Sequence, residues 1–490
     1  MEAIQKKDET KTRLIVIGLC CLWLSLTETG YGQVSLPRVF SDNMVLQQKS
    51  DVPIWGKDRP GTKVNITCSW GAKAIAKADN SGRWKVEIRT PAAGGPFLIY
   101  VKGSSRIVLK NIMAGEVWLC AGQSNMAMKL QGNINEPVEN SNRTILESAN
   151  PSLRVFTVEP QASLSPKEDV AGAWSEASPT TSSSYSATAY YFGVMLQKTL
   201  KVPIGLIVSA YNGTSIVAWS DKKALAPFPE IEVPVSIPEY GEGKKYSNPQ
   251  NTPTFLYNAM IHPLVPYTIK GAIWYQGESD RGRSNIYDKL FANMIEDWRQ
   301  ERGQPNLPFY FVQIAPFYYW NAGNAAFLRE AQLHVMQKIT STGMVVTQDV
   351  GDEFVVHASK KKQVGDRLAY WALSQTYGIR NISYSGPIYK SFEIDSNRVN
   401  VFFDYAQLGF SSFGKKLTGF QVAGADKKFH DATAVIRSVV RSGKTIPIVS
   451  LYSVDVPKPI AARYAFENYV EGSLYNTAGL PASSFRTDTW

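Results

Sequence analysis

Between residues 114 and 378, apolar segments of strand length alternate with segments of helical periodicity, and this alternation constrains the fold more than any other feature of the chain. The apolar segments contain few polar residues, which is typical of strands buried on both faces of a parallel sheet. The expected strands cover residues 116–120, 153–158, 204–210, 269–275, 309–314 and 344–347, and the expected helices cover 187–200, 285–302, 325–339 and 361–377. The middle of the chain is therefore predicted to form an α/β domain with helices on both faces of a parallel sheet.

The two flanking regions differ from this middle region because they consist of short alternating segments separated by turn residues. In residues 33–113 this spacing predicts an antiparallel β-rich domain that resembles a sandwich. Residues 379–490 return to the same pattern and are predicted to form a second β-rich region. Residues 226–254 are rich in Pro, Glu, Gly and Ser and are expected to form a long surface loop near the functional site.

Residues 1–32 have the charge and hydropathy pattern of a secretory signal peptide. Basic residues lie within residues 6–13, an apolar run covers residues 14–26, and small residues follow as far as Gly32. The apolar run is shorter than the about 20 residues that a membrane span requires. We therefore expect cleavage near Gly32, with an uncleaved anchor as the alternative. The mature protein is expected to be periplasmic or secreted, with no membrane span after cleavage.

The formal net charge of +10 comes from basic residues that are scattered along the chain. This distribution does not predict binding to nucleic acid, for which basic residues cluster on one face. Two of the four cysteines lie in the predicted signal peptide, and Cys68 and Cys120 are expected to be buried free thiols. The cysteines and histidines show no zinc-like spacing, so we expect neither a metal nor another cofactor.

Ser124 follows the first predicted strand, in the sequence LCAGQSNMAM. A serine at this position can cap the helix that follows, or it can act as a nucleophile with backbone N–H groups nearby for an oxyanion. The pentapeptide GQSNM lacks the second glycine of the G-x-S-x-G nucleophile elbow, so the sequence does not predict the α/β-hydrolase elbow. The residues alone leave both the cap and the nucleophile open.

A nucleophilic serine needs a general base, and His357 is the best placed of the four histidines. His357 follows the last predicted strand and precedes the last predicted helix, at the edge of the sheet where ligands bind. After other strands, Gln276 could donate its amide to an oxyanion, Glu278 could orient an imidazole, and Gly213 could offer its backbone N–H. Each residue alone also fits an ordinary turn or loop, but together they favour an open α/β hydrolase.

Six segments of the chain resemble known proteins: GEVWLCAGQSNM, NGTSIVAW, PTFLYNAMIHPLVPYTIKGAIWYQGESD, FLREAQ, HASKKKQVGDRLAYWAL and the C-terminal AGLPASSFRTDTW. They are similar to the bacterial sialate O-acetylesterases, which are carbohydrate acetylesterases of the SGNH hydrolase superfamily. The resemblance covers nearly the whole chain after residue 32. It implies that residues 114–378 form an SGNH-type, flavodoxin-like hydrolase domain with flanking β-sandwich-like regions.

The resemblance also implies roles for single residues. Ser124 matches the nucleophile and His357 matches the catalytic base. The backbone N–H groups of Ser124 and Gly213, together with the amide of Gln276, are the implied oxyanion hole. No metal is implied in this mechanism, in which the serine is acetylated and then hydrolysed.

The acid that orients His357 is the point at which the chain departs from the family pattern. Many SGNH enzymes have an aspartate three residues before the histidine, and this chain has Phe354 there. Some related acetylesterases use the acid that corresponds to Glu278, which is therefore our first expectation. Asp352 and Asp349 are the alternatives, and a Ser–His dyad without an acid is a further one.

The function implied by the resemblance is removal of O-acetyl groups from carbohydrates by a serine esterase. O-acetylated sialic acids are the expected substrates, and acetylated xylan or another acetylated glycan is the alternative. A carbohydrate-binding protein without turnover and a lipase-like or peptidase activity also stay open. The sequence indicates neither the position of the acetyl group nor an oligomeric state.

Overall fold

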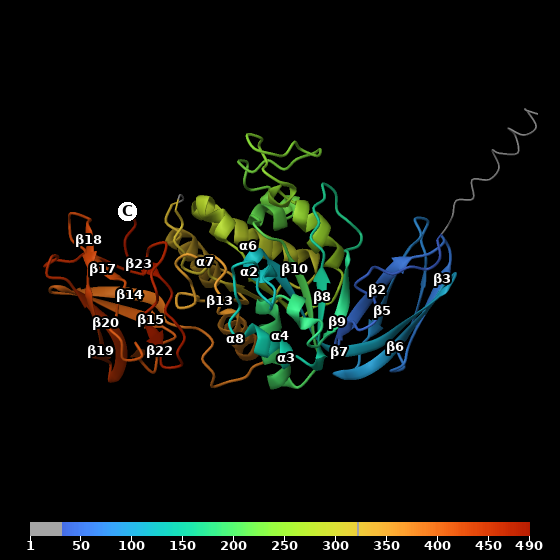
Figure 1. Ribbon diagram of the computed structural model, residues 1–490, viewed down its shortest axis with the longest axis horizontal. Coiled ribbons are helices and arrows are strands. Elements are labelled where there is room, and N and C mark those ends of the chain that lie inside the picture. The colour runs from blue at the N-terminus through green and yellow to red at the C-terminus, as the bar shows by residue number, and fades with distance from the viewer. Residues whose placement is uncertain (1–31, 321–322) are drawn as a thin grey trace, which may run out of the picture.

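The computed structural model describes residues 32–320 and 323–490, so the predicted signal peptide lies almost entirely outside the described residues. Three parts follow one another along the longest axis of the molecule, with an α/β part between two β-rich parts (Figure 1). In the described part of the chain, no helix is both long enough and apolar enough to cross a membrane.

The central sheet confirms the predicted α/β fold class. Its strands lie in the order β13-β12-β11-β7-β10-β8-β9, and each neighbouring pair is parallel except β8 and β9. The strands are β7 (Arg106–Gly122), β8 (Asn150–Val158), β9 (Gly172–Ala177), β10 (Ile204–Ala210), β11 (Gly271–Tyr275), β12 (Phe309–Val312) and β13 (Thr342–Val345). The segment β10-β7-β11-β12-β13 has the 2-1-3-4-5 order of a flavodoxin-like sheet, and β8 and β9 extend it at one edge.

Helices cover both faces of this sheet, as the near-continuous apolar strands predict. One face packs against α4 (Ala187–Leu200) and α8 (Lys361–Trp371), and the other packs against α6 (Ser284–Glu301) and α7 (Ala326–Lys338). Successive side chains of β7 alternate between the two layers because the side-chain period of a strand is two. Trp118 packs edge-on against Phe192 of α4, whereas its neighbour Leu119 belongs to the core on the opposite face.

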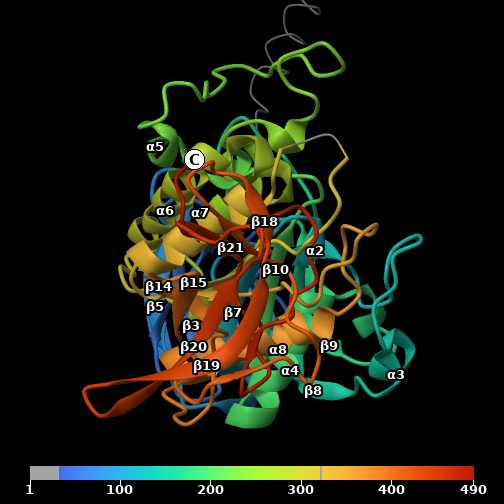
Figure 2. The same ribbon diagram turned by 90° about the vertical axis from the view of Figure 1, so that its left-hand side faces the viewer.

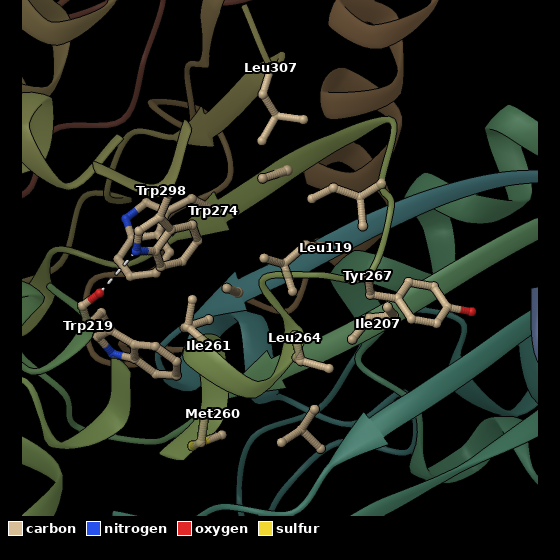
Figure 3. Close-up of a cluster of buried hydrophobic side chains, with 14 of the residues drawn as sticks. Leu119, Ile207, Trp219, Met260, Ile261, Leu264, Tyr267, Trp274, Trp298 and Leu307 are labelled. Carbon is tan, nitrogen blue, oxygen red and sulfur yellow. Dashed lines mark hydrogen bonds between the residues drawn. The ribbon is translucent and has the colours of Figure 1, made fainter. Parts of the chain in front are cut away.

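The core under α6 contains the cluster of buried aromatic side chains in Figure 3. Trp274 of β11 lies edge-on to Trp219 and to Trp298, with ring centroids 5.8 Å apart in both pairs. The indole N–H of Trp298 donates to the backbone carbonyl of Trp219 at 3.2 Å. This packing fixes the strand whose C-terminal end leads into the sequence QGESD.

Strand β7 joins the N-terminal part to the central sheet as one continuous strand. Its first half pairs with β6, and its second half pairs with β10 and β11. The sequence pattern places the boundary between the N-terminal β-rich domain and the α/β domain after residue 113, and this position lies within β7. The other N-terminal strands are β1 (Val45–Gln47), β2 (Asp51–Lys57), β3 (Lys63–Cys68), β4 (Lys73–Lys77), β5 (Arg83–Arg89) and β6 (Gly94–Lys102).

The N-terminal strands form two layers, with β2 paired to β5 and with β3 paired to β4 and β6. Alternate residues of β2, β3 and β5 are buried, so the inward faces of the layers share one apolar core. Cys68 and Cys120 are both buried and free, which confirms that prediction. Burial raises the pKa of Cys68 to about 12 and that of Cys120 well above its ordinary value.

The C-terminal part contains two four-stranded antiparallel sheets, and it faces the viewer in Figure 2. The strand orders are β14-β15-β20-β19 and β18-β17-β21-β23, and β16 pairs with β22. These strands are β14 (Ile388–Asp395), β15 (Arg398–Asp404), β16 (Phe410–Ser411), β17 (Phe420–Ala423), β18 (Phe429–Asp431), β19 (Thr433–Arg441), β20 (Lys444–Tyr452), β21 (Ala461–Tyr464), β22 (Tyr475–Asn476) and β23 (Phe485–Arg486). Both sheets contribute to one apolar core.

Short helices lie in the connections at the edges of the central sheet. The α-helical ones are α2 (Ser124–Ala127), α3 (Ser141–Leu146) and α5 (Lys222–Leu225). A π-helical segment, Ala372–Thr376, continues α8 almost to the expected end of that helix. Helix α4 has the bounds that the sequence predicts, and α6 and α7 differ from their predicted bounds by one residue at each end.

Candidate active site

A tight turn after β7 carries Ser124 to the C-terminal edge of the sheet. Gly122 has a φ of +143°, and a Cβ there would lie 2.1 Å from the backbone oxygen of Tyr275 at the end of β11. Only glycine fits this close approach. The next residue donates its backbone N–H to the same Tyr275 oxygen at 2.9 Å. Ser124 thus lies where β7 borders β11, which is the topological switch point of a flavodoxin-like sheet.

The structure places Ser124 in the first turn of α2 and not at its N-cap. Gln123 occupies the N-cap position, and Ser124 is the first helical residue. Its backbone N–H has no intrahelical acceptor, because the first N–H groups of a helix never do. The Ser124 hydroxyl makes no hydrogen bond with any of residues 32–320 and 323–490. The hydroxyl is therefore not occupied by a capping role.

His357 lies in the loop between β13 and α8, and a glutamate holds its ring. The Nδ1 of His357 is 2.5 Å from Oε1 of Glu136, and both side chains are largely buried. Because a carboxylate only accepts, Nδ1 carries the proton and Nε2 is the basic nitrogen. The second oxygen of Glu136 accepts from the Asn133 amide at 3.1 Å. A base that is held by an orienting acid in this way can activate a serine.

Glu278, the first expectation for the orienting acid, has a different partner. Its Oε1 accepts from the side-chain amide of Asn125 at 2.5 Å, and Oε2 has no hydrogen-bond partner among the described residues. The structure therefore does not place Glu278 on Nδ1 of His357, which Glu136 occupies. The physical reason is that the Asn125 amide holds the Glu278 carboxylate, while the Glu136 carboxylate contacts the imidazole.

The two alternative acids also have partners of their own. Asp352 accepts the backbone N–H groups of Phe354 and Val355 at 3.0 and 3.2 Å, so it stabilises a turn. Asp349 forms a two-pronged ion pair with Arg367, with N–O distances of 2.7 and 2.6 Å. Glu136, which sequence reasoning missed, lies in the loop between α2 and α3, 221 residues from His357. No spacing in the sequence signals that contact.

A hydrogen bond joins the residue after Ser124 to the residue before His357. The side-chain amide of Asn125, which follows Ser124, donates to the backbone carbonyl of Val356 at 3.2 Å. Val356 directly precedes His357. The helix that begins at Ser124 and the loop that carries His357 are therefore joined one residue away from each predicted catalytic side chain.

Gln276 does not have the free amide that an oxyanion donor needs. Its Nε2 donates to the backbone carbonyl of Thr214 at 2.8 Å and to Oδ2 of Asp280 at 2.6 Å. Its Oε1 accepts from the hydroxyl of Tyr287 at 2.9 Å. Both amide hydrogens are engaged, which argues against the expected role. Because the Thr214 carbonyl follows Gly213 directly, Gln276 instead supports the turn that contains Gly213.

The backbone N–H of Gly213 remains free to donate to an oxyanion. Its φ is +65°, and a Cβ there would meet open space, so the turn and not crowding requires the glycine. Its carbonyl accepts from the Asn251 amide at 2.9 Å, while its N–H has no acceptor in the described part of the chain. An unpaired backbone N–H is available to a developing oxyanion.

A cavity of about 600 Å³ opens beside Gly213. The loop predicted over residues 226–254 forms part of its wall through Glu230, Glu232, Lys245 and Asn251, and Arg283 also lines it. This volume lies within the range of small-molecule sites. Within residues 32–320 and 323–490, no group of three or more His, Cys, Asp or Glu side chains is arranged to hold a metal ion.

Replacing Gln276 by Leu should lower the free energy of unfolding by about 3 kcal/mol, because buried polar partners lose their hydrogen bonds. Gln276 is fully buried, and the change leaves the Thr214 carbonyl and the Tyr287 hydroxyl without this partner. Urea unfolding measures the effect. The exposed Gln300 is the matched control, for which the same change should stay within about 0.5 kcal/mol. A large loss of turnover at unchanged stability would instead support the oxyanion role.

Comparison with known proteins gives consistent matches. A family model described as carbohydrate esterase, sialic acid-specific acetylesterase matches residues 114–374. The sialate O-acetylesterase of Mus musculus is 32% identical over 417 residues, which cover 72% of this chain and 76% of the mouse protein. The sialate O-acetylesterase of Homo sapiens is 29% identical over 498 residues, with 91% of each chain covered.

One solved structure has about the same sequence identity to this chain as the mouse and human proteins have. A carbohydrate acetylesterase from Xanthomonas citri aligns with a TM-score of 0.83 and 33% sequence identity. The alignment covers 93% of this chain and 100% of the Xanthomonas citri chain. The likeness therefore extends over the central sheet and both flanking β-rich parts.

Proposed function

We propose, from the premise that this chain belongs to the sialic acid-specific acetylesterase family of carbohydrate esterases, that Ser124, His357 and Glu136 hydrolyse O-acetyl groups on sialic acids. As a member of that family the protein is a carbohydrate acetylesterase and thus a carboxylic ester hydrolase. The observation that carries the residue assignment is the contact between Nδ1 of His357 and Glu136, in a loop tied to the Ser124 helix.

In the proposed mechanism, Nε2 of His357 accepts the proton of the Ser124 hydroxyl as its oxygen attacks the acetyl carbonyl. Glu136 keeps the proton on Nδ1 and stabilises the imidazolium that forms. The backbone N–H groups of Ser124 and Gly213 donate to the oxyanion of the tetrahedral intermediate. His357 then protonates the departing sugar oxygen, and water activated by the same nitrogen releases acetate from Ser124.

The cavity beside Gly213 is the proposed site of the sugar. Its wall contains Arg283, whose Nη1 is held by Ser215 and Asp280 and whose side chain is half exposed. A guanidinium in this position can pair with the carboxylate of a sialic acid. Glutamates in the same wall can accept hydrogen bonds from sugar hydroxyl groups. Both kinds of contact suit an acetylated acidic sugar.

A substrate panel tests this proposal. Acetate release should be at least tenfold faster, in kcat/KM, from O-acetylated sialic acid than from acetylated xylo-oligosaccharides. Aryl acetate should be cleaved faster than aryl esters of long acyl chains. A preference for acetylated xylo-oligosaccharides would replace sialic acid by a neutral glycan as the substrate. A preference for long acyl chains would contradict the acetylesterase assignment of this site.

A further inference from the structure

A buried lysine contacts the residue that follows Ser124. Lys361 is the first residue of α8, and its side chain is almost fully buried. Its ammonium donates to Oδ1 of Asn125 and lies 5.7 Å from the ring centroid of Tyr275. A lysine is almost never buried to this degree unless it has a partner. The proposed mechanism does not use this charge.

The side chain of Asn125 joins three segments at this point. Its Oδ1 accepts from Lys361 of α8, and its Nδ2 donates to Glu278 after β11 and to the carbonyl of Val356. Its backbone oxygen also accepts from the hydroxyl of Thr188 in α4 at 3.1 Å. The residue next to the proposed nucleophile is thus held by four hydrogen bonds.

The charges of Lys361 and Glu278 are linked through this amide. Burial lowers the pKa of Lys361 to about 7, while the carboxylates of Glu278 and Glu136 oppose that change. Glu278 is itself buried, and one of its carboxylate oxygens lacks a hydrogen-bond partner in the part of the chain that the structure describes. Removing either charge would leave the other buried without its counter-charge, which is costly.

We propose that Lys361, Asn125 and Glu278 form a positioning unit that fixes Ser124 relative to the loop of His357. Burying two opposite charges is seldom the most stable use of a core, so stability alone does not account for Lys361 and Glu278, which both contact Asn125. The amide at its centre contacts the carbonyl that precedes His357, and its own residue follows Ser124. The inference rests on the proposed function, because it assigns to these residues an effect on Ser124 and His357.

The test uses Lys361→Met, Glu278→Gln and the double variant, with Lys362→Met as the control. Lys362 is the next residue of α8, but its side chain is exposed and paired with Asp366. With aryl acetate as the substrate, Lys361→Met should lower kcat about 100-fold while KM changes less than threefold, as expected for misplaced catalytic groups. Lys362→Met should keep kcat and KM within twofold.

Two further measurements separate positioning from a merely structural role. The rate constant for covalent labelling of Ser124 by an aryl phosphonate should fall in parallel with kcat, after normalisation to the fraction of folded protein. The loss in the double variant should be smaller than the product of the two single losses, because that variant leaves no unpaired buried charge. Single losses that multiply, or a labelling rate that stays at the wild-type value, would overturn the proposal.

Ser124→Ala separates failure of this inference from failure of the proposed function. If Ser124→Ala is inactive and the Lys361 and Glu278 variants keep wild-type kcat, only the positioning unit is disproved. If Ser124→Ala retains wild-type turnover, the nucleophile assignment fails, and the positioning unit fails with it.

Discussion

Replacing Ser124 by Ala is expected to lower kcat for acetyl ester hydrolysis by about 10⁴- to 10⁶-fold, as loss of a serine nucleophile does. The Ser124 hydroxyl has no hydrogen-bond partner within the described residues, so its removal should change the free energy of unfolding by less than about 1 kcal/mol. Initial rates with aryl acetate, measured beside urea unfolding curves, test both statements. Burst kinetics provide a second readout, since the acetyl-enzyme burst should disappear.

Ser182 supplies the matched control for this variant. It is also a buried serine whose hydroxyl has no hydrogen-bond partner in residues 32–320 and 323–490, but it lies in the short helical turn before α4, and no catalytic role is proposed for it. Ser182→Ala should keep kcat within twofold of the wild-type value. If Ser124→Ala loses stability and Ser182→Ala does not, the Ser124 hydroxyl has a structural role that its contacts do not reveal. If Ser124→Ala stays fully active, another nucleophile performs the reaction.

The sequence predicts the central fold because the relevant signals are local. Strands buried on both faces read as apolar runs, and β10 and β11 are buried at every position. The same runs locate Ser124, Gly213 and His357, because each of them follows a strand and the C-terminal ends of parallel strands meet at one edge. The position of each residue after its strand is enough to locate it at this edge, whatever its neighbours are.

The partners of the polar side chains could not be predicted in the same way. Gln276 follows a strand, but its amide is engaged by Asp280, only four residues further on. Glu136 reaches His357 from a loop with no helical or strand periodicity, across 221 residues of sequence. The hydrogen-bond partner of such a side chain depends on how loops pack against one another. A hydrogen bond between two distant loops produces no periodic pattern in the sequence. The proposed acid, Glu136, is therefore the part of the candidate site that the sequence predicts least.

Replacing Glu136 by Gln should lower kcat by about 10²- to 10⁴-fold, because the ring of His357 loses the acceptor that fixes its tautomer and stabilises the imidazolium. Gln keeps the size of the side chain, so the free energy of unfolding should change by less than about 1 kcal/mol. Steady-state rates with aryl acetate measure the loss. Asp352→Asn is the matched control, since an asparagine oxygen can still accept the two turn N–H groups, and kcat should stay within threefold.

The loss in Glu136→Gln should also depend on His357, because the role proposed for Glu136 is exerted through the imidazole that it contacts. In a His357→Ala background, Glu136→Gln is expected to cause no further decrease in kcat, which is the non-additivity of residues that act as a unit. An additional decrease in that background would mean that Glu136 contacts the substrate or the oxyanion directly. Wild-type kcat in Glu136→Gln together with a large loss in Asp352→Asn would transfer the orienting role to Asp352. Full activity in both variants would leave Ser124 and His357 as a dyad, in which the protein environment alone holds the imidazole.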